Sequence, residues 1–420
     1  MDHRVLPHRA ISEEADMQNP TCRFGGVDWA TDAHAIAIVD EAGRLVDEFD
    51  VEQTAGDLAE LCRRLDNHGV RRLAIERPDG PVVDPLLAAR LEVVVVASRS
   101  VKALRERYGT AGNKSDRSDA YVLADCLRTD GHRWRSLEPD SPATVTLRNH
   151  VRAGKNLVET RVATANQLRA HLRVAFPGAV ALFADIDSPI SLRFLERFPS
   201  AARAAWLSEK RLGAWLRANG YCGRKSPAEL YRCLAEAPAG VGSDEGDVRG
   251  AVVLAFVEVL KTLRTQIDEL TARMAEQLDT HPDAAIFTSL PRVGVVRAAT
   301  LLAEIGNCRA RFPDAEALAS LAGVAPSTRA SGRHRSVTFR WSSDKRLRDA
   351  LCDFAGDSWR ANAWAEHRYR ALRASGKRHP HAERILARSW AHIIWRCWQD
   401  RVPYDPALHR SHQRFVAGEA

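Results

Sequence analysis

The sequence of 420 residues has little of what membrane, secreted and zinc-binding proteins share. It lacks any apolar run near the ~20 residues of a membrane span, and its polar start has no apolar segment of a signal peptide. Its eight cysteines are scattered, without a C-x-x-C pair or a Cys/His cluster at zinc spacing, which predicts reduced thiols. Internal repeats and low-complexity tracts are absent as well. We therefore expect a cytoplasmic protein without membrane contact, with a flexible tail over residues 1–22.

Hydrophobic residues, by contrast, make up 45% of the chain, which excludes a disordered protein and supports two or three domains. The formal net charge is +7, but it is unevenly spread. From Arg329 to the C-terminus there are 19 Lys/Arg against 9 Asp/Glu, a net charge of about +10, and the preceding residues sum to about −3. This asymmetry predicts that nucleic acid contacts the C-terminal part most. A generally Arg-rich composition would explain the same charge.

Three short β-type runs open the ordered part of the chain at residues 24–30, 34–40 and 44–51. The elements expected next are helix 54–69, strand 71–77, helix 82–90, strand 91–98 and helix 100–109. Three antiparallel strands followed by α-β-α-β-α is the order of the ribonuclease H-like (RuvC-like) fold, a mixed α/β sheet flanked by helices. We assign this domain to residues 23–138.

The rest of the chain is wholly helical in pattern. One long helix is predicted over 142–175 and a second over 248–279, after a linker-like stretch at 236–247. The second helix carries apolar residues in steps of three and four, at Val253, Phe256, Leu260, Leu263, Ile267, Leu270 and Met274. This stripe fits an intramolecular pair with the first long helix or a dimerising coiled coil. We expect some self-association, as a dimer or tetramer, because two long stripes exceed what one small bundle needs.

A final helical block begins near Ala285. Its stretch TSLPRVGVVRAATLLAEIGN has the pattern of a helix-hairpin-helix element, whose turn can present backbone N–H groups to a phosphate. We divide the helical part into a helical and coiled-coil region at 139–280, a mostly α-helical C-terminal domain at 281–402, and a tail at 403–420. The shorter helices expected over 180–236 suggest no function.

Four acids occupy positions where this fold order would bring them together. Asp28 and Glu76 each follow a buried strand, and Asp116 and Asp119 are one helical turn apart in NKSDRSDA. Each has a simpler explanation; the last two, for example, are ordinary first-turn acids of a helix capped by Ser115. Uncompensated carboxylates at one sheet edge would repel, however, and Mg²⁺ prefers such hard oxygen ligands. All four in this order predict a metal site, in which two ions about 4 Å apart can catalyse phosphoryl transfer.

Sugar kinases of the ASKHA type share this fold and a GxDxG opening, which GGVDWATDAHAIAIVDEAGRLV resembles. In those enzymes a glycine lets the phosphate approach, and this chain has Ala30 there. The later half also has no second glycine-rich phosphate loop. The sequence therefore disfavours a kinase.

The motifs GVDWA, AIERP and NKSDRSDA, with LPRVGVVRAATLLAEIG and LAGVAPSTRASGRHRS further on, resemble the DEDD transposases over about residues 23–400. These are insertion-sequence recombinases with a RuvC-like N-terminal domain and a C-terminal transposase domain, here 281–402. The resemblance implies a bacterial, nucleoid-associated enzyme that binds Mg²⁺, or alternatively Mn²⁺, through Asp28, Glu76, Asp116 and Asp119. It also implies a composite active site in an oligomer, and an element-encoded bridge RNA that pairs with donor and target DNA.

The family's nucleophile is a serine that precedes a glycine and forms a covalent phosphoserine link to DNA, and Ser331 matches it. From the residues alone, Ser331 lies in a small, basic, loop-like segment, where a plain turn and the rivals Ser327 and Ser336 stay open. The basic residues expected to contact nucleic acid flank the two motifs: Lys114, Arg117, Arg329, Arg333 and Arg335. The alternative activities are a RuvC-like endonuclease that hydrolyses branched DNA with water, and a binding-only descendant.

Overall fold

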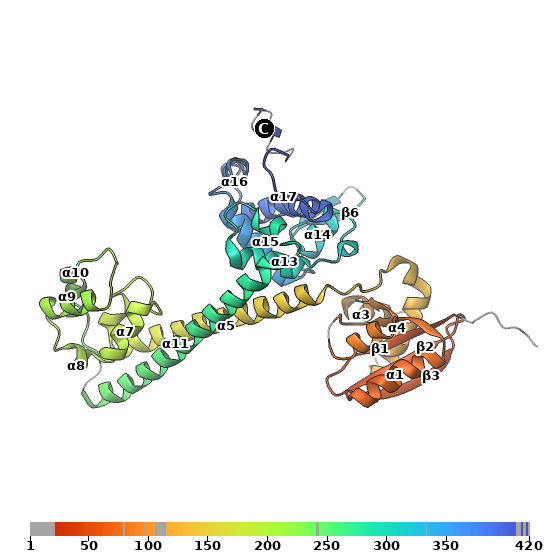
Figure 1. The fold of residues 1–420 in the computed structure, drawn as a ribbon, viewed down its shortest axis with the longest axis horizontal. Coiled ribbons are helices and arrows are strands. Elements are labelled where there is room, and N and C mark those ends of the chain that lie inside the picture. The colour runs from red at the N-terminus through yellow and green to blue at the C-terminus, as the bar shows by residue number, and fades with distance from the viewer. Residues whose placement is uncertain are drawn as a thin grey trace, which may run out of the picture. The chain divides into compact units, whose positions relative to one another are not determined.

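The computed structural model describes residues 22–78, 80–96, 98–105, 115–240, 243–332, 334–408, 413–414 and 417–418. The chain divides into two compact units, Met1–Pro139 and Asp140–Ala420. Figure 1 shows the first as a sheet with flanking helices and the second as helical apart from one hairpin. No helix among the described residues is long and apolar enough to cross a membrane.

The first unit is built on a five-stranded sheet of order β3-β2-β1-β4-β5. Its strands are β1 (Arg23–Asp28), β2 (Ala33–Val39), β3 (Leu45–Glu52), β4 (Val70–Ile75) and β5 (Glu92–Val95). The first three strands pair antiparallel, and β4 and β5 join parallel. The helices are α1 (Ala55–Asn67), α2 (Val83–Ala88), α3 (Ser98–Arg105) and α4 (Asp116–Asp130), followed by a short 3-10 turn at Gly131–Arg133. The predicted mixed sheet and element order are confirmed.

The two faces of this sheet have different side chains because strand residues alternate between faces. Large apolar residues of β1 and β4, such as Val27 and Leu73, pack against α1 in one core cluster. On the opposite face, Gly26 lies under α4, and a Cβ atom there would lie only 2.0 Å from the Ala120 carbonyl oxygen. Small residues on this face therefore let α4 lie directly on the central strand.

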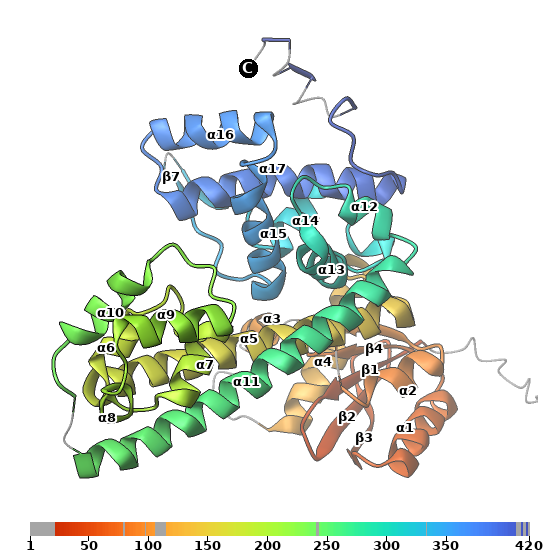
Figure 2. The same ribbon diagram turned by 60° about the vertical axis from the view of Figure 1, so that its left-hand side comes forward.

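In the second unit, α5 (Pro142–Ala175) and α11 (Ser243–Asp279) form a long antiparallel pair (Figure 2). Hydrogen bonds join them near both ends: His150 to Gln277 at 2.9 Å, and His171 to the Arg249 carbonyl at 3.1 Å. The intramolecular pairing left open by the sequence is thus present, whereas self-association stays a prediction. The linker-like stretch is shorter than predicted, because α11 already begins at Ser243.

Five short helices between α5 and α11 form a small helical subdomain: α6 (Pro177–Val180), α7 (Pro189–Arg197), α8 (Ala201–Ala204), α9 (Glu209–Ala218) and α10 (Pro227–Ala235). Four of them begin at a serine whose hydroxyl accepts a backbone N–H: Ser188, Ser200, Ser208 and Ser226. Their core centres on Phe194, which contacts three other aromatic rings edge-on or tilted.

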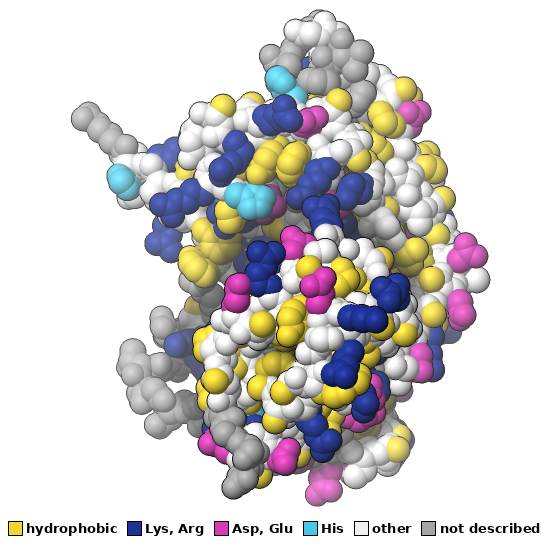
Figure 3. Space-filling model, turned by 90° about the vertical axis from the view of Figure 1, so that its left-hand side faces the viewer, with side chains coloured by type: hydrophobic (Ala, Val, Ile, Leu, Met, Phe, Trp, Pro, Cys, Tyr) yellow, Lys and Arg dark blue, Asp and Glu magenta, His cyan; other side chains and the backbone are white. Residues whose placement is uncertain are grey.

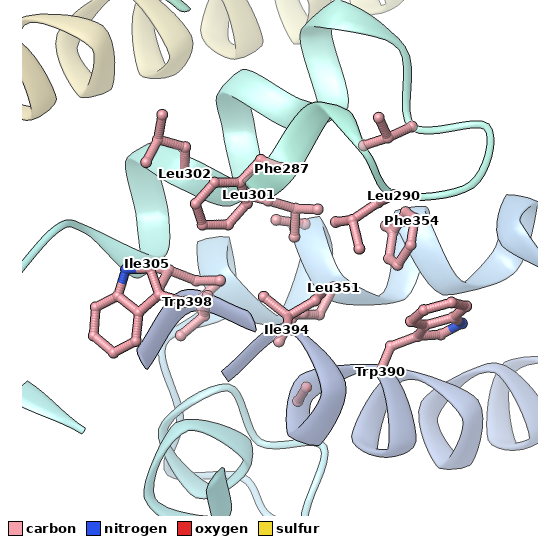
Figure 4. Close-up of a cluster of buried hydrophobic side chains, with 14 of the residues drawn as sticks. Phe287, Leu290, Leu301, Leu302, Ile305, Leu351, Phe354, Trp390, Ile394 and Trp398 are labelled. Carbon is pink, nitrogen blue, oxygen red and sulfur yellow. The ribbon is translucent and has the colours of Figure 1, made fainter. Parts of the chain in front are cut away.

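The C-terminal elements are α12 (Ala284–Thr288), α13 (Gly294–Ile305), a 3-10 turn (Arg309–Arg311), α14 (Ala315–Leu321), β6 (Ser327–Ser331), β7 (His334–Thr338), α15 (Lys345–Ser358), α16 (Ala363–Ala374) and α17 (His379–Asp400). Figure 4 shows their core, where Phe354 and Trp390 meet with ring centroids 5.1 Å apart. The predicted helix-hairpin-helix pattern requires a tight turn between its helices. The turn between α12 and α13 has positive φ at Arg292 and Gly294, as a tight turn needs. The loop-like segment predicted around Ser331 is instead a β-hairpin, β6–β7.

Candidate active site

Three carboxylates of the first unit gather where α4 begins. Asp28 ends β1, and Asp116 and Asp119 lie in the first turn of α4, whose start is capped by the Ser115 hydroxyl at 3.1 Å from the Ser118 N–H. One oxygen from each of the three carboxylates lies within 4.8 Å of the others. Asp119 is only 1% exposed, Asp28 is half-buried and Asp116 is exposed.

Glu76 is not among the acids within this distance of one another. Parallel pairing of Val27 with Ile75 nevertheless puts Glu76 beside Asp28, one residue beyond the end of β4. Ala74, two residues earlier, belongs to the cluster that packs on α4, so the alternation points position 76 toward the same face. Glu76 itself lies in a bend that follows the strand.

Clustered carboxylates need positive charge nearby, and Arg105 of α3 supplies some of it. Its Nη2 donates to Asp119 Oδ2 at 2.6 Å, and its Nε approaches Oδ1 of the same carboxylate. No sequence pattern singles out Arg105, since the contact joins residues 14 positions apart in different helices. Its guanidinium compensates one of the three negative charges.

Arg117, one of the basic residues predicted beside the acids, does not face them. Arg117 donates to Asp50 Oδ2 at 2.6 Å and lies 3.5 Å from Glu48 Oε2, both on β3. Its hydrogen bond to Asp50, with the charges of Asp50 and Glu48, raises the pKa of the guanidinium. Lys114 lies outside the described residues. Whether Arg117 leaves these partners for nucleic acid stays a prediction.

The donor set suits a hard divalent cation. Carboxylate oxygens at opposite corners of an Mg²⁺ shell lie about 4 Å apart, since each bond is about 2.1 Å long. Because the three carboxylate oxygens already lie within 4.8 Å of one another, a small adjustment of their side chains would let them bind one such ion. The exposure of Asp116 also leaves room for water or phosphate oxygens, which such an ion retains.

The other predicted residues lie on the β6–β7 hairpin. Ser331 ends β6, is exposed, and pairs with His334 across a turn in which Gly332 has a φ of 55°. Arg329 is two residues from Ser331 on the same strand, so the two share a face. Its cross-strand partner is Ser336, which therefore shares that face too. Ser331 thus has a cation and a histidine as near neighbours.

Two of the other predicted residues, Ser327 and Arg335, lie farther along the hairpin from Ser331 or on its other face. Ser327 lies at the far end of β6, four residues from Ser331, and pairs with Thr338. Arg335 pairs with Ala330, so it points to the other face of the hairpin. Arg333 lies outside the described residues. The choice of Ser331 over the rivals Ser327 and Ser336 stays a prediction.

A mixed sheet of order β3-β2-β1-β4-β5, with acids at the end of its central strand and on the helix above it, is consistent with a ribonuclease H-like enzyme of the DEDD class. Residues 25–177 match the model of a DEDD transposase family, and residues 284–370 match that of the IS116/IS110/IS902 transposases. The chain is 33% identical over 395 residues to a Streptomyces coelicolor protein assigned as the mini-circle transposase of IS117, covering 91% of this chain and 95% of that one. It is 29% identical to an IS900 protein of Mycobacterium paratuberculosis, covering 91% of this chain and 97% of that one.

The chain belongs to the IS116/IS110/IS902 family of insertion-sequence transposases. It is therefore a DNA-recombining enzyme, and its DEDD class implies the use of a divalent metal ion. The acidic cluster of Asp28, Asp116 and Asp119 fits that use.

Proposed function

We propose that this transposase cleaves and exchanges DNA strands in a Mg²⁺-dependent reaction, guided by a bridge RNA from its own element, with Ser331 as nucleophile. The observation that carries the proposal is that Asp28, at the end of β1, and Asp116 and Asp119, in the first turn of α4, have carboxylate oxygens within 4.8 Å of one another. These three residues, with Glu76 from the adjacent strand, would hold the metal. A bound Mg²⁺ would stabilise the negative charge that builds on the scissile phosphate.

The hairpin residues suggest how the covalent step proceeds. Ser331 Oγ attacks phosphorus, and the new O–P bond forms as the bond to the departing DNA oxygen breaks. His334, the cross-strand neighbour of Ser331, is positioned to accept the hydroxyl proton, and Arg329 on the same face can donate to the phosphate oxygens. The departing DNA oxygen takes up a proton from solvent.

The decisive experiment combines the purified protein with flanking RNA of its element, donor DNA and target DNA, and measures recombinant junctions. We expect Asp116→Ala and Ser331→Ala each to abolish junctions, and a denaturing gel of the wild type to show a covalent protein–DNA adduct. Ser327→Ala and Ser336→Ala are matched controls that keep the adduct. Full activity in both Asp116→Ala and Ser331→Ala would refute the mechanism.

Two further outcomes discriminate between alternatives. DNA cleavage without any adduct would support a RuvC-like endonuclease that uses water. Junctions that do not change when the pairing segments of the RNA are changed would exclude RNA guidance. His334→Gln should slow adduct formation at least about tenfold while DNA binding is kept, because only proton transfer is lost.

We also propose that the working form is a homo-oligomer, a dimer or tetramer. The proposal is supported by apolar side chains left accessible midway along the α5–α11 pair: Val158 is 36% and Val162 48% exposed, and Ile267 is only half-buried. Exposed apolar side chains that line up along a helix pair are typical of an association surface. Analytical ultracentrifugation measures the state directly, and a monomer at micromolar concentration would contradict the proposal.

A further inference from the structure

An exposed tryptophan stands just beyond the β6–β7 hairpin. Trp341 is 81% exposed, more than any other large hydrophobic side chain that the structure describes as exposed. An indole left in water forgoes the stabilisation of burial, so its position calls for an explanation outside the core. Its ring packs edge-on against Phe339, with centroids 4.9 Å apart and planes at 84°. The indole is thus supported at one edge, while most of its surface remains open.

Arginines hold this aromatic pair in place. The guanidiniums of Arg348, from α15, and Arg384, from α17, lie 5.5 and 4.6 Å from the Phe339 ring centroid. Arg340, between the two rings in sequence, donates to the carbonyl oxygens of Ala325 and Pro326 at 3.2 and 3.3 Å. The segment is therefore tied to the start of the hairpin and to two helices. Such support pre-organises the indole before any partner arrives.

The surroundings of Trp341 are strongly basic. Residues 327–348 contain seven Lys/Arg and one Asp/Glu. That acid, Asp344, caps α15 and accepts the N–H groups of Arg346 and Leu347 at 2.9 and 3.1 Å, so its carboxylate is engaged by the backbone. On the upper part of the face drawn in Figure 3, dark blue Lys and Arg side chains gather around yellow apolar ones. An open aromatic face among cations is the chemistry that binds unpaired nucleotides: the base stacks and the phosphates pair with the cations.

We propose that Trp341 is a stacking platform for an unpaired nucleobase, in single-stranded DNA or RNA, beside the Ser331 hairpin. The proposal rests on the proposed function and deepens it, because it names a nucleotide contact just beyond the base of the hairpin whose turn carries the proposed nucleophile. A fully paired duplex hides the faces of its bases, so the platform discriminates unpaired from paired strands.

The test measures binding of the full chain to three fluorescent oligonucleotides by anisotropy at one fixed salt concentration: single-stranded DNA, single-stranded RNA of the same sequence, and blunt duplex DNA. Trp341→Ala should weaken single-strand binding about fivefold or more, since stacking on one aromatic ring contributes about 1–3 kcal/mol per base. Duplex binding should change less than about twofold. Trp341→Phe should restore most of the affinity, and the strand type that loses affinity identifies the source of the base.

Trp206 offers a matched control in the helical subdomain. It is 58% exposed and has the Arg211 guanidinium 4.5 Å from its ring, but it lies outside the basic segment. Trp206→Ala should bind all three oligonucleotides as the wild type does. Equal losses in both variants, or no loss in Trp341→Ala, would overturn the proposal.

The outcome is separable from that of the proposed function. Ser331→Ala should keep single-strand binding, because it removes the nucleophile and leaves the indole. Selective loss of single-strand binding in Trp341→Ala, together with wild-type junction formation in Ser331→Ala, would leave the platform standing and refute the nucleophile. An adduct on Ser331, together with normal single-strand binding by Trp341→Ala, would support the nucleophile and refute the platform.

Discussion

Replacing Gly26 by alanine tests whether the approach of α4 to β1 builds the acidic cluster. A Cβ atom at this position would lie 2.0 Å from the Ala120 carbonyl oxygen and 2.5 Å from the Ala124 nitrogen. Both atoms belong to the backbone of α4, so no side-chain rotation relieves the clash. Because real Cβ contacts essentially never fall under 3.0 Å, α4 must withdraw by about 1 Å.

The cost follows from that displacement. Overpacking a tight core typically costs about 1–3 kcal/mol, and backbone obstacles put Gly26→Ala near the upper end, at about 3 kcal/mol. For a domain of this size that lowers the Tm of the first unit by roughly 10 °C. The withdrawal also carries Asp116 and Asp119 away from Asp28. Since Mg²⁺ demands near-ideal octahedral geometry, its affinity should fall at least about tenfold.

Gly25→Ala is the matched control. A Cβ atom at Gly25 meets only side-chain atoms on the other face of the sheet, the nearest being Leu73 Cβ at 3.2 Å. Both variants gain the same stability from a less flexible unfolded chain, so that term cancels in the comparison. Differential scanning calorimetry and calorimetric Mg²⁺ titration of both proteins are the measurements. Equal melting temperatures and equal Mg²⁺ affinities in the two variants would refute the idea that Gly26 sets the distance.

Three other perturbations have defined outcomes. Burial raises the pKa of Asp140, but hydrogen bonds from Arg148 and two backbone N–H groups outweigh this and leave the pKa below its usual 3.8. The stabilisation by this carboxylate is therefore present above about pH 4 and is lost on acidification. Asp140→Ala should lower the free energy of unfolding by about 3 kcal/mol at neutral pH and by much less in acid, as measured by denaturant unfolding. Arg105→Gln should bind Mg²⁺ about tenfold more tightly in calorimetric titrations, because the ion no longer displaces a guanidinium from Asp119; unchanged affinity would contradict this. Val162→Glu should shift the sedimentation equilibrium toward monomer without lowering the Tm, since that side chain is already 48% exposed.

The sequence predicted most of the architecture because its periodic signals are strong. Helix α5 was expected over 142–175 and has those bounds, since Ser141 and Pro142 mark its start and an apolar stripe runs its length. The hairpin β6–β7 was missed because its residues are mostly exposed, so the sequence has no alternation of apolar and polar residues that would indicate the strands. The start of α11 was placed too late, because glycines and acids in GVGSDEGD read as a linker.

The candidate site was predictable only as far as element order determines it. Strand ends and a helix start could be read from the pattern, and these bring Asp28 and Asp119 together. The contact between Arg105 and Asp119 could not be predicted from the sequence, because it depends on how α3 packs beside α4. Nor could the pairing of Arg117 with Asp50, which joins residues 67 positions apart. Pairings of this kind are tertiary, and no local spacing encodes them.

The structure separates two explanations of NKSDRSDA that the sequence could not. A helix-start explanation holds for Ser115, whose hydroxyl caps α4, and for Asp116, an exposed first-turn acid that the helix dipole favours. It fails for Asp119, which is 1% exposed and lies against Asp28. Burying a carboxylate beside another one is costly unless a cation compensates it, and the Arg105 guanidinium, which donates to Asp119 Oδ2 at 2.6 Å, supplies one such charge. The two aspartates are one helical turn apart, but only Asp116 has the exposed position of an ordinary first-turn acid, whereas the packing of α4 on β1 buries Asp119 inside the acidic cluster.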